Sequence, residues 1–296
     1  MLRPREGAEY SIGIYSGEVP WSISPDERIQ NPVLTWRDVS DVPASMVADP
    51  FMICVNGIYY MFFEVVNLLN RKGEIGFATS NDGCTWSYGE RVLKEPYHLS
   101  YPYVFEWEGE YFMIPEGSRG GGIKLYRADD FPRGWNRVAE LLSGNRYADS
   151  SIFRYDSKWY IFTDSGAEPL NPKLSLYCAD RLTGPWEEHP ASPIVTDDPH
   201  VARPGGRVLV VDDIVIRFAQ DVYPIYGSKV RAFEITELSS TNYVEREISS
   251  NPVLEAGGTE WRSGGMHHVD AHQTKEGGWL ACVDGFYLRN SKKASS

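Results

Sequence analysis

Five segments, spaced about 50 to 65 residues apart, place polar side chains immediately before an apolar run. They read Ala48-Asp-Pro50, Ser100-Tyr-Pro102, Ala148-Asp-Ser150, Ala202-Arg-Pro204 and His267-His-Val-Asp270. If the runs that follow are equivalent strands around one axis, the segments bring carboxylates, a guanidinium, a phenol and two imidazoles together. An aspartate before a strand is also a common turn residue, but the whole set predicts a site. Its members are Asp49, Tyr101, Asp149, Arg203, His267 and His268.

A second set of polar residues stands where the second apolar run of each repeat ends. Its members are Glu64, Glu116, Asp164, Gln220 with Asp221, and Asp284. Carboxylates that share one mouth raise each other's pKa, which is the condition for a general acid at neutral pH. The alternative is that each residue ends a turn on a solvated rim. The candidate substrate-binding residues are Tyr101, Asp164, Arg203, Arg217, Gln220, Asp221, His267 and His268.

The run from Met266 to His272 suggests a metal site. Side chains alternate along a strand, so His268, Asp270 and His272 would share one face. Zinc would need a further ligand there, and calcium would need more oxygen donors. A catalytic histidine or a contact to a sugar hydroxyl is an equally open interpretation. We expect that no cofactor is required, and we keep a divalent metal in the central channel as a hypothesis.

Recurring aromatic residues identify the elements that must position these side chains. Three times an aromatic is followed nine residues later by a tryptophan, in the pairs Phe77 and Trp86, Tyr126 and Trp135, and Tyr177 and Trp186. Alternating apolar runs around each pair, with hairpin signals such as Asn56-Gly57 and Glu108-Gly109, predict four-stranded antiparallel units. Repeats of this length built from strands are typical of a β-propeller.

The number of repeats predicts an all-β, five-bladed β-propeller that occupies residues 1–296 as a single domain. The blades are expected near residues 41–97, 98–146, 147–198, 199–255 and 264–288. The last blade has only two strands, and residues 10–36 contain two more. We therefore expect the N-terminal strands to complete the last blade and to remove two open sheet edges. An open β-sandwich is the alternative, but it leaves the repeat unexplained.

Charge and apolar pattern exclude some partners. The formal net charge of −12 and the pI of about 5.0 argue against binding to nucleic acid or to an anionic membrane. No apolar run is long enough to span a membrane, and the first residues lack the apolar core of a signal peptide. The four cysteines show no paired spacing, which predicts buried free thiols in a reducing compartment. We expect a cytoplasmic protein, whose oligomeric state the sequence leaves open.

Several stretches along nearly the whole chain carry a family resemblance. They include Val47-Ala-Asp-Pro-Phe-Met52, His98-Leu-Ser-Tyr-Pro-Tyr-Val-Phe-Glu106, Met113-Ile-Pro-Glu116, Arg203-Pro-Gly-Gly-Arg207 and His267-His-Val-Asp270. The chain resembles the N-terminal propeller domain of plant glucosamine inositolphosphorylceramide transferases and looks like one of its bacterial relatives. It is also similar to the five-bladed propellers of glycoside hydrolase family 43. The resemblance to the plant proteins implies that sugar transfer belongs to a separate C-terminal domain, so a glycosyltransferase is an expected partner.

The similarity to family 43 implies roles for three carboxyl groups. Those enzymes invert the anomeric centre with an aspartate base from the first blade, a second aspartate that tunes pKa and orients substrate, and a glutamate acid from a later blade. Asp49 matches the base and Asp149 plausibly matches the second aspartate. The fourth-blade position expected to carry the acid holds Arg203 instead. Glu116 or Asp164 would then supply the proton, and we favour Glu116.

Three functions remain open on this basis. The first is a carbohydrate-active enzyme that resembles inverting glycosidases and cleaves or transfers a glycosyl group or a similar polyhydroxylated small molecule. The second is a non-catalytic carbohydrate-recognition propeller that works beside a separate glycosyltransferase. The third is a biosynthetic tailoring enzyme that uses the same pocket for elimination or cyclisation. The expected ligand is a small-molecule carbohydrate or glycoconjugate.

Overall fold

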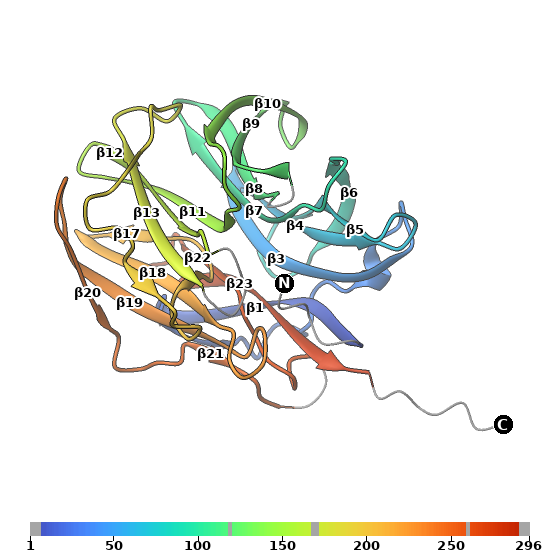
Figure 1. Ribbon diagram of the computed structural model, residues 1–296. Helices are drawn as coiled ribbons and strands as arrows, with labels where there is room; N and C mark the ends of the chain where they lie inside the picture. The colour runs from blue at the N-terminus through green and yellow to red at the C-terminus, as the bar shows by residue number, and fades with distance from the viewer. Residues whose placement is uncertain (1–6, 118–119, 167–171, 259–260, 290–296) are drawn as a thin grey trace.

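The computed structural model describes residues 7–117, 120–166, 172–258 and 261–289. These residues form five small antiparallel sheets around one axis, which confirms the predicted five-bladed β-propeller (Figure 1). The helical content of this part of the chain is the 3₁₀ turn η1 (Trp36–Asp38). Within the same residues, no helix has the length and apolar character needed to cross a bilayer.

The strands follow the chain blade by blade. Blade 1 contains β3 (Ala44–Val55), β4 (Ile58–Asn67), β5 (Lys72–Ser80) and β6 (Ser87–Leu93). Blade 2 contains β7 (Ser100–Trp107), β8 (Glu110–Glu116), β9 (Ile123–Asp130) and β10 (Arg133–Leu142). Blade 3 contains β11 (Ala148–Tyr155), β12 (Lys158–Asp164), β13 (Lys173–Ala179), β14 (Glu187–Glu188) and β15 (Val195–Thr196). Blade 4 contains β16 (Arg203–Pro204), β17 (Leu209–Val211), β18 (Ile214–Asp221), β19 (Lys229–Leu238), β20 (Tyr243–Glu247) and β21 (Leu254–Glu255).

The last blade joins the two ends of the chain, as the sequence predicts. It contains β22 (Val269–Gln273), β23 (Trp279–Leu288), β1 (Ala8–Val19) and β2 (Ser22–Pro25), in the spatial order β2-β1-β23-β22. The antiparallel register of β1 and β23 runs without a break from Ala8 opposite Leu288 to Gly17 opposite Trp279. Because β1 and β23 pair along their length, the first and last strands of the chain leave no open sheet edge between them.

Tight turns join the first and second strands of four blades. In the turn between β3 and β4, Asn56 and Gly57 both adopt positive φ angles, 51° and 82°. The turn between β7 and β8 repeats this with Glu108 at 52° and Gly109 at 78°. Two consecutive residues with positive φ define the hairpin turn whose twist matches that of paired strands. The hairpin signals of the sequence are therefore confirmed.

The repeated tryptophans have equivalent positions and equivalent bonds. The indole N–H of each donates to a backbone carbonyl three or four residues earlier: Trp86 to Gly83 at 3.1 Å, Trp135 to Pro132 at 2.9 Å and Trp186 to Leu182 at 3.1 Å. Each bond closes the loop that leads from the third strand into the fourth. Satisfying a largely buried N–H within its own loop explains why the residue recurs once per blade.

The four cysteines are free thiols, but the expectation that they are buried holds only for Cys282. Cys54 is exposed, and Cys84 and Cys178 are half-buried. Cys54 lies on β3 one residue before its end, where side chains alternate between the core and solvent.

Candidate active site at the channel mouth

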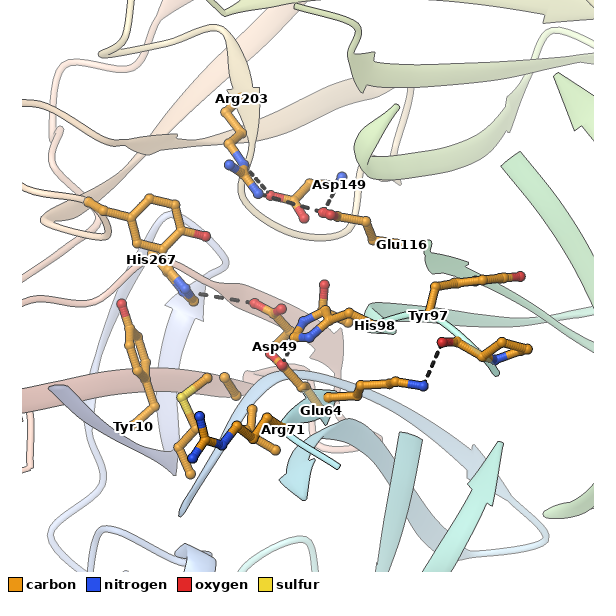
Figure 2. Close-up of a pocket in the computed structure, with 17 residues that line it drawn as sticks. Tyr10, Asp49, Glu64, Arg71, Tyr97, His98, Glu116, Asp149, Arg203 and His267 are labelled. Atoms are coloured by element: carbon orange, nitrogen blue, oxygen red, sulfur yellow. Dashed lines mark hydrogen bonds and ion pairs between the residues drawn. The ribbon is translucent and has the colours of Figure 1, made fainter. Parts of the chain in front are cut away.

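A cavity of about 540 Å³ opens at the end of the channel where the inner strands begin (Figure 2). Every blade contributes a polar residue to its wall, and these are Asp49, Glu116, Asp149, Arg203 and His267. Glu64, at the end of the second strand of blade 1, also lines it. The structure therefore brings together the three candidate catalytic carboxyls and two of the candidate substrate-binding residues.

The inner strands of blades 1, 2 and 3 contain the same strained backbone at equivalent positions. Asp49, Tyr101 and Asp149 have φ angles of 53°, 47° and 49°. In each blade the register to the second strand shifts at this point, between Ala48 and Phe51 in blade 1 and at the equivalent residues of blades 2 and 3. A non-glycine residue in this region costs about 1–3 kcal/mol and persists only where the surroundings fix it. The bulge turns the side chain away from the face of the sheet. In blades 1 and 3 it directs Asp49 and Asp149 into the cavity wall.

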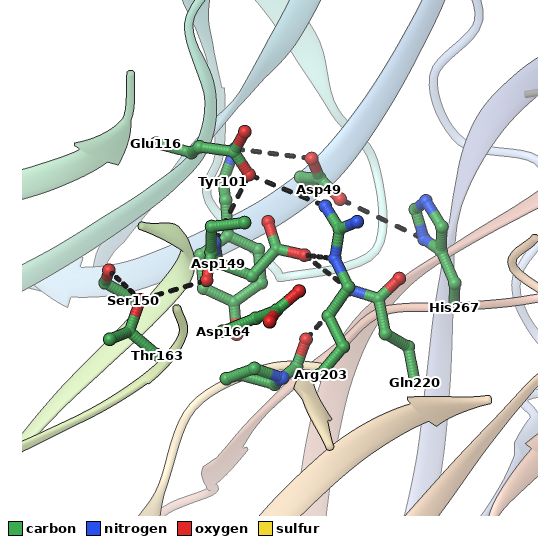
Figure 3. Close-up of polar contacts among 12 residues, drawn as sticks. Asp49, Tyr101, Glu116, Asp149, Ser150, Thr163, Asp164, Arg203, Gln220 and His267 are labelled. Carbon is green, nitrogen blue, oxygen red and sulfur yellow. Dashed lines mark hydrogen bonds and ion pairs between the residues drawn. The ribbon is translucent and has the colours of Figure 1, made fainter. Parts of the chain in front are cut away.

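Asp149 is the anionic centre of the wall (Figure 3). Its Oδ2 accepts a hydrogen bond from Arg203 Nε at 2.5 Å and another from Gln220 Nε2 at 2.5 Å. Its backbone N–H donates to Glu116 Oε2 at 3.2 Å, and Arg203 Nη2 lies 3.6 Å from the same oxygen. A single guanidinium thus serves two buried carboxyl groups.

The protons divide unequally between these two acids. Burial and the charge of Asp149 raise the pKa of Glu116 to about 8. Burial also opposes the ionisation of Asp149, but Arg203 and a hydrogen bond from Glu116 outweigh it and lower the pKa of Asp149. At neutral pH, Glu116 is the protonated partner and Asp149 the ionised one. Two carboxyls with pKa values pushed apart form a matched acid and anion.

A second acid–cation pair, between His267 and Asp284, stands beside Asp49. His267 Nδ1 lies 2.8 Å from Asp284 Oδ1 and 3.9 Å from Asp49 Oδ1. The other oxygen of Asp284 accepts the backbone N–H of Asp49 at 3.0 Å. Burial opposes protonation of His267, but the charges of Asp284 and Asp49 raise its pKa to about 9. Burial, only partly opposed by His267, raises the pKa of Asp49 well above its usual range.

Four carboxyls of this cluster, Asp49, Glu116, Asp149 and Asp284, share two cations, Arg203 and His267, and the excess of carboxyls is held protonated. Asp149 pairs with Arg203, and Asp284 pairs with His267. Asp49 and Glu116 have no full counter-charge of their own, and among these four carboxyls they are the two whose pKa values are raised. Like charges in one enclosure cannot all ionise. The arrangement can donate a proton and accept one, and it can bind the polar groups of a ligand between Asp49 and Glu116.

Sequence reasoning missed several residues that complete the cavity. Tyr10 stacks on the His267 ring, with centroids 4.9 Å apart, and its buried hydroxyl has no hydrogen-bond partner among the described residues. Tyr226 stands edge-on to the same imidazole at 5.4 Å. Tyr97, Arg71 and Lys72 also line the cavity. Tyr10 lies in β1, Lys72 is the first residue of β5 and the others lie in loops, so a search restricted to the ends of inner and second strands passes over them.

His98, from the loop that enters blade 2, is the clearest omission. Its Nε2 lies 2.9 Å from Glu64 Oε1, and its Nδ1 accepts the backbone N–H of Gly73 at 2.9 Å. A side chain at Gly73 would place its Cβ 2.2 Å from the carbonyl oxygen of Leu99. Glycine at that position therefore permits the close approach that orients the imidazole. The sequence signal was present, because His98 opens one of the stretches that carry the family resemblance.

Three candidate substrate-binding residues lie behind the wall rather than on it. The Tyr101 hydroxyl is 2.8 Å from Ser151 Oγ and donates to the carbonyl of Gly206 at 3.0 Å. Gln220 holds Asp149, and Asp164 accepts two backbone N–H groups at 2.9 and 3.0 Å. Burial raises the pKa of Asp164. These residues support the wall residues and are not part of the cavity lining.

The other candidates lie elsewhere. Arg217 is fully buried and forms a two-pronged pair with Glu245 of β20, which includes a bond from its Nη2 at 2.6 Å. Asp221 contacts His200 Nδ1 at 3.0 Å outside the cavity lining. His268 Nε2 contacts the carbonyl of Pro50 at 2.9 Å, and burial lowers the pKa of His268 to about 4. Arg217 and Gln220 are three residues apart on β18, so alternation places them on opposite faces.

The metal hypothesis for His268, Asp270 and His272 needs correction. Asp270 is already bound by Arg207 Nε at 2.5 Å and by the backbone N–H of Met52 at 2.6 Å, and His272 Nε2 lies 2.9 Å from it. The potential ligand group among the described residues is instead Asp49, His267 and Asp284, whose donor atoms lie within 4.8 Å of one another. One nitrogen and two oxygen donors suit a divalent cation. Binding there would require Asp49 and His267 to give up protons.

Comparison with known proteins agrees with this fold. The family model for the N-terminal part of glucosamine inositolphosphorylceramide transferase 1 matches residues 3–286. The transferase of that name from Oryza sativa subsp. japonica is 34% identical over 95% of this chain, and the one from Arabidopsis thaliana is 32% identical over 93%. The chain spans about 40% of the length of these relatives. A solved glycosyl hydrolase from Bacteroides ovatus superposes with a TM-score of 0.65 at 11% identity, over 89% of this chain and 93% of that chain, which supports the fold alone.

Proposed function

We propose that this chain, which belongs to the family of the N-terminal part of glucosamine inositolphosphorylceramide transferase 1, performs acid/base chemistry on a glycosyl-containing ligand at its channel mouth. The observation that carries the proposal is the Glu116–Asp149–Arg203 arrangement. A buried glutamic acid with a pKa of about 8 stands beside an aspartate held ionised by arginine, on the wall of a cavity that also contains Asp49. That combination supplies an acid at neutral pH together with fixed charge.

In the proposed reaction, Glu116 gives its proton to the oxygen that leaves the anomeric carbon. Asp49, in its ionised form, accepts a proton from the attacking water or acceptor hydroxyl as the new carbon–oxygen bond forms. Asp149 and Arg203 hold polar groups of the ligand. They also keep Asp49 and Glu116 in different protonation states. His267, held by Asp284, stabilises the negative charge on Asp49. The competent form therefore carries one proton across Asp49 and Glu116, with Asp49 ionised and Glu116 protonated.

The test begins with a screen of the purified protein against a carbohydrate array, followed by analysis of products. With a ligand in hand, Asp49→Asn should retain binding and lose turnover by at least about a hundredfold, since the shape is preserved while the base is removed. Glu116→Gln should slow substrates with poor leaving groups far more than activated ones. Asp180→Asn, at an exposed position on blade 3, is the matched control and should leave both properties unchanged. Turnover that survives in both Asp49→Asn and Glu116→Gln would contradict the catalytic proposal.

A non-catalytic recognition role is the second candidate, and one observation favours it. The raised pKa of Asp49 favours the protonated form of the carboxyl that would have to act as base. The relatives are longer and bear the name of a transferase, so a neighbouring glycosyltransferase would supply the chemistry. Array binding without any product from the wild-type protein would establish this role. Elimination or cyclisation in the same cavity would instead yield a product that lacks the elements of water or has gained a ring.

The proposed ligand is accordingly a carbohydrate or glycoconjugate, and the proposed protein partner is a glycosyltransferase. The four unpaired thiols support a reducing compartment such as the cytoplasm. Cell fractionation tests that location directly.

A further inference from the structure

The three most exposed large hydrophobic side chains of the described residues lie in two connections between strands that also contribute residues to the cavity wall. Leu69 is 75% exposed, Tyr223 is 55% and Leu68 is 52%, whereas the other large hydrophobics that are exposed range from 37% to 48%. Leu68 and Leu69 lie in the β4–β5 turn, which also contributes Arg71 and Lys72 to the cavity wall. Tyr223 lies in the β18–β19 loop, which contributes Tyr226. Single exposed apolar residues need no explanation, but a group beside a binding site does.

The exposure of the two leucines is built into the turn. Asn67 Oδ1 accepts the backbone N–H of Leu69 at 2.9 Å, and Asn70 Oδ1 accepts that of Lys72 at 2.9 Å. Both asparagine side chains donate to Glu74, at 3.2 and 2.7 Å. The backbone N–H of Leu68 bonds the carbonyl of Pro43 at 2.9 Å. Because Asn67 and Glu74 are buried, the turn is anchored in the blade and holds its tip in water.

Cations stand directly beside this apolar tip. Arg71 follows the leucines with a φ of 58° and lines the cavity, and its side chain forms no ion pair within the described residues. Lys72 Nζ donates to the carbonyl of Pro96 at 2.5 Å, which leaves its charge without a carboxylate partner there. Figure 2 shows Arg71 at the edge of the cavity, away from the Asp149–Arg203 pair. Two leucines followed by two cations combine an apolar anchor with contacts for phosphate, as interfacial segments do.

We propose that the cavity mouth docks on a phospholipid surface through the β4–β5 turn, with Leu68 and Leu69 entering the interface and Arg71 and Lys72 contacting lipid phosphate. A membrane fits better than a protein partner, because the exposed apolar residues are two adjacent leucines in one turn and one tyrosine in a loop of another blade, which is too few for a protein interface. The net charge of −12 repels anionic lipid from the rest of the surface, so the contact is confined to the mouth. The docking deepens the proposed function, since it would present a lipid-linked glycoconjugate to the cavity.

Sedimentation with vesicles tests the docking on the full chain. The wild-type protein should cosediment with phosphatidylcholine vesicles, and Leu68→Ser with Leu69→Ser should lower the partition coefficient at least about tenfold. Arg71→Gln with Lys72→Gln should lower it less than the leucine changes do, because phosphatidylcholine carries no net charge and the two cations contact only its phosphate. The matched control is Val210→Ser with Ile214→Ser, which changes two exposed apolar residues on the β17–β18 turn at the opposite ends of the strands. That control should bind as the wild type does.

Absence of cosedimentation, or equal loss in the control and the Leu68/Leu69 variant, would overturn the docking proposal. Cosedimentation that appears only when a second protein is present would also overturn it, in favour of a protein partner. Binding of a soluble carbohydrate, measured on the same samples, separates this result from the proposed function. A Leu68/Leu69 variant that binds soluble carbohydrate normally but not vesicles has lost docking alone.

Discussion

Two clusters of buried charge occupy the same propeller channel with different charge balance. In the first, Asp270 of β22 receives Arg207 from blade 4 and a backbone N–H from blade 1, with His272 beside it. Arg207 also donates to the carbonyl of Val104 in blade 2 at 2.9 Å. Burial disfavours the charge of Asp270, but Arg207 and His272 outweigh it and lower the pKa of this carboxyl.

The second cluster, at the mouth, also combines carboxyls with an arginine and a histidine, but it has fewer cations than carboxyls. Arg203 serves both Asp149 and Glu116, and His267 serves both Asp284 and Asp49. The Tyr10 hydroxyl has no partner in the described chain. A fully satisfied cluster ties blades together, whereas an unsatisfied one beside a cavity is available to a ligand. Charge balance, rather than the presence of charge, distinguishes the two regions.

Removing one arginine from each cluster should expose this difference most strongly. Arg207→Met leaves Asp270 buried without its main counter-charge, so we expect the free energy of unfolding to fall by about 3–5 kcal/mol. Arg203→Met should cost less than half of that, because neighbouring carboxyls at the mouth already take up protons. Urea denaturation at neutral pH measures both values. Equal losses would mean that the two clusters play the same structural role.

The proton held by Glu116 should appear in the pH dependence of stability. Its pKa is about 8 in the folded protein and about 4.5 ordinarily, so between these values the folded state binds more protons than the unfolded chain. Stability contributed by this group is therefore complete below about pH 4.5 and is lost as the pH rises through about 8. Glu116→Gln removes the titration and should become steadily more stable relative to the wild type across this window.

Thermal denaturation at several pH values measures that trend. Asp180→Asn, which changes an exposed carboxyl, should show no such trend and serves as the control. A constant difference in melting temperature between Glu116→Gln and the wild type would show that Glu116 is already ionised at neutral pH.

A divalent metal should stabilise the protein through the mouth cluster alone, and this effect should be smaller than those above. A metal bound by Asp49, His267 and Asp284 at ten times its Kd would add about 1.4 kcal/mol of stability. The rise in melting temperature should grow with pH, because His267, with a pKa of about 9, must lose its proton. His267→Ala should abolish the shift and His272→Ala should preserve it. A shift lost with His272, or none in any variant, would remove the metal hypothesis from the mouth.

Much of the fold follows from the sequence, because its signals are local. Asn56-Gly57 sets its hairpin by its own backbone preference, and Trp86 bonds within its own loop. The seam between β1 and β23 was predictable because residues 10–36 supplied the two strands that the last repeat lacked. Each of these inferences depends on neighbouring residues or on a repeat that can be counted.

The site was only partly predictable, because its members meet through the closure of the ring. The equivalent position in each repeat predicted Asp49, Asp149, Arg203 and His267, because that position of every inner strand lies at the mouth. Tyr101 occupies the same position but its hydroxyl bonds Gly206 within the channel. His268 and His272 share a strand face but lie about 13 Å apart along the strand, which is too far for both to bind one ion. Tyr10 and His98 approach the mouth only through tertiary contacts, and the sharing of Arg203 and His267 by four carboxyls exists only once all five blades have met.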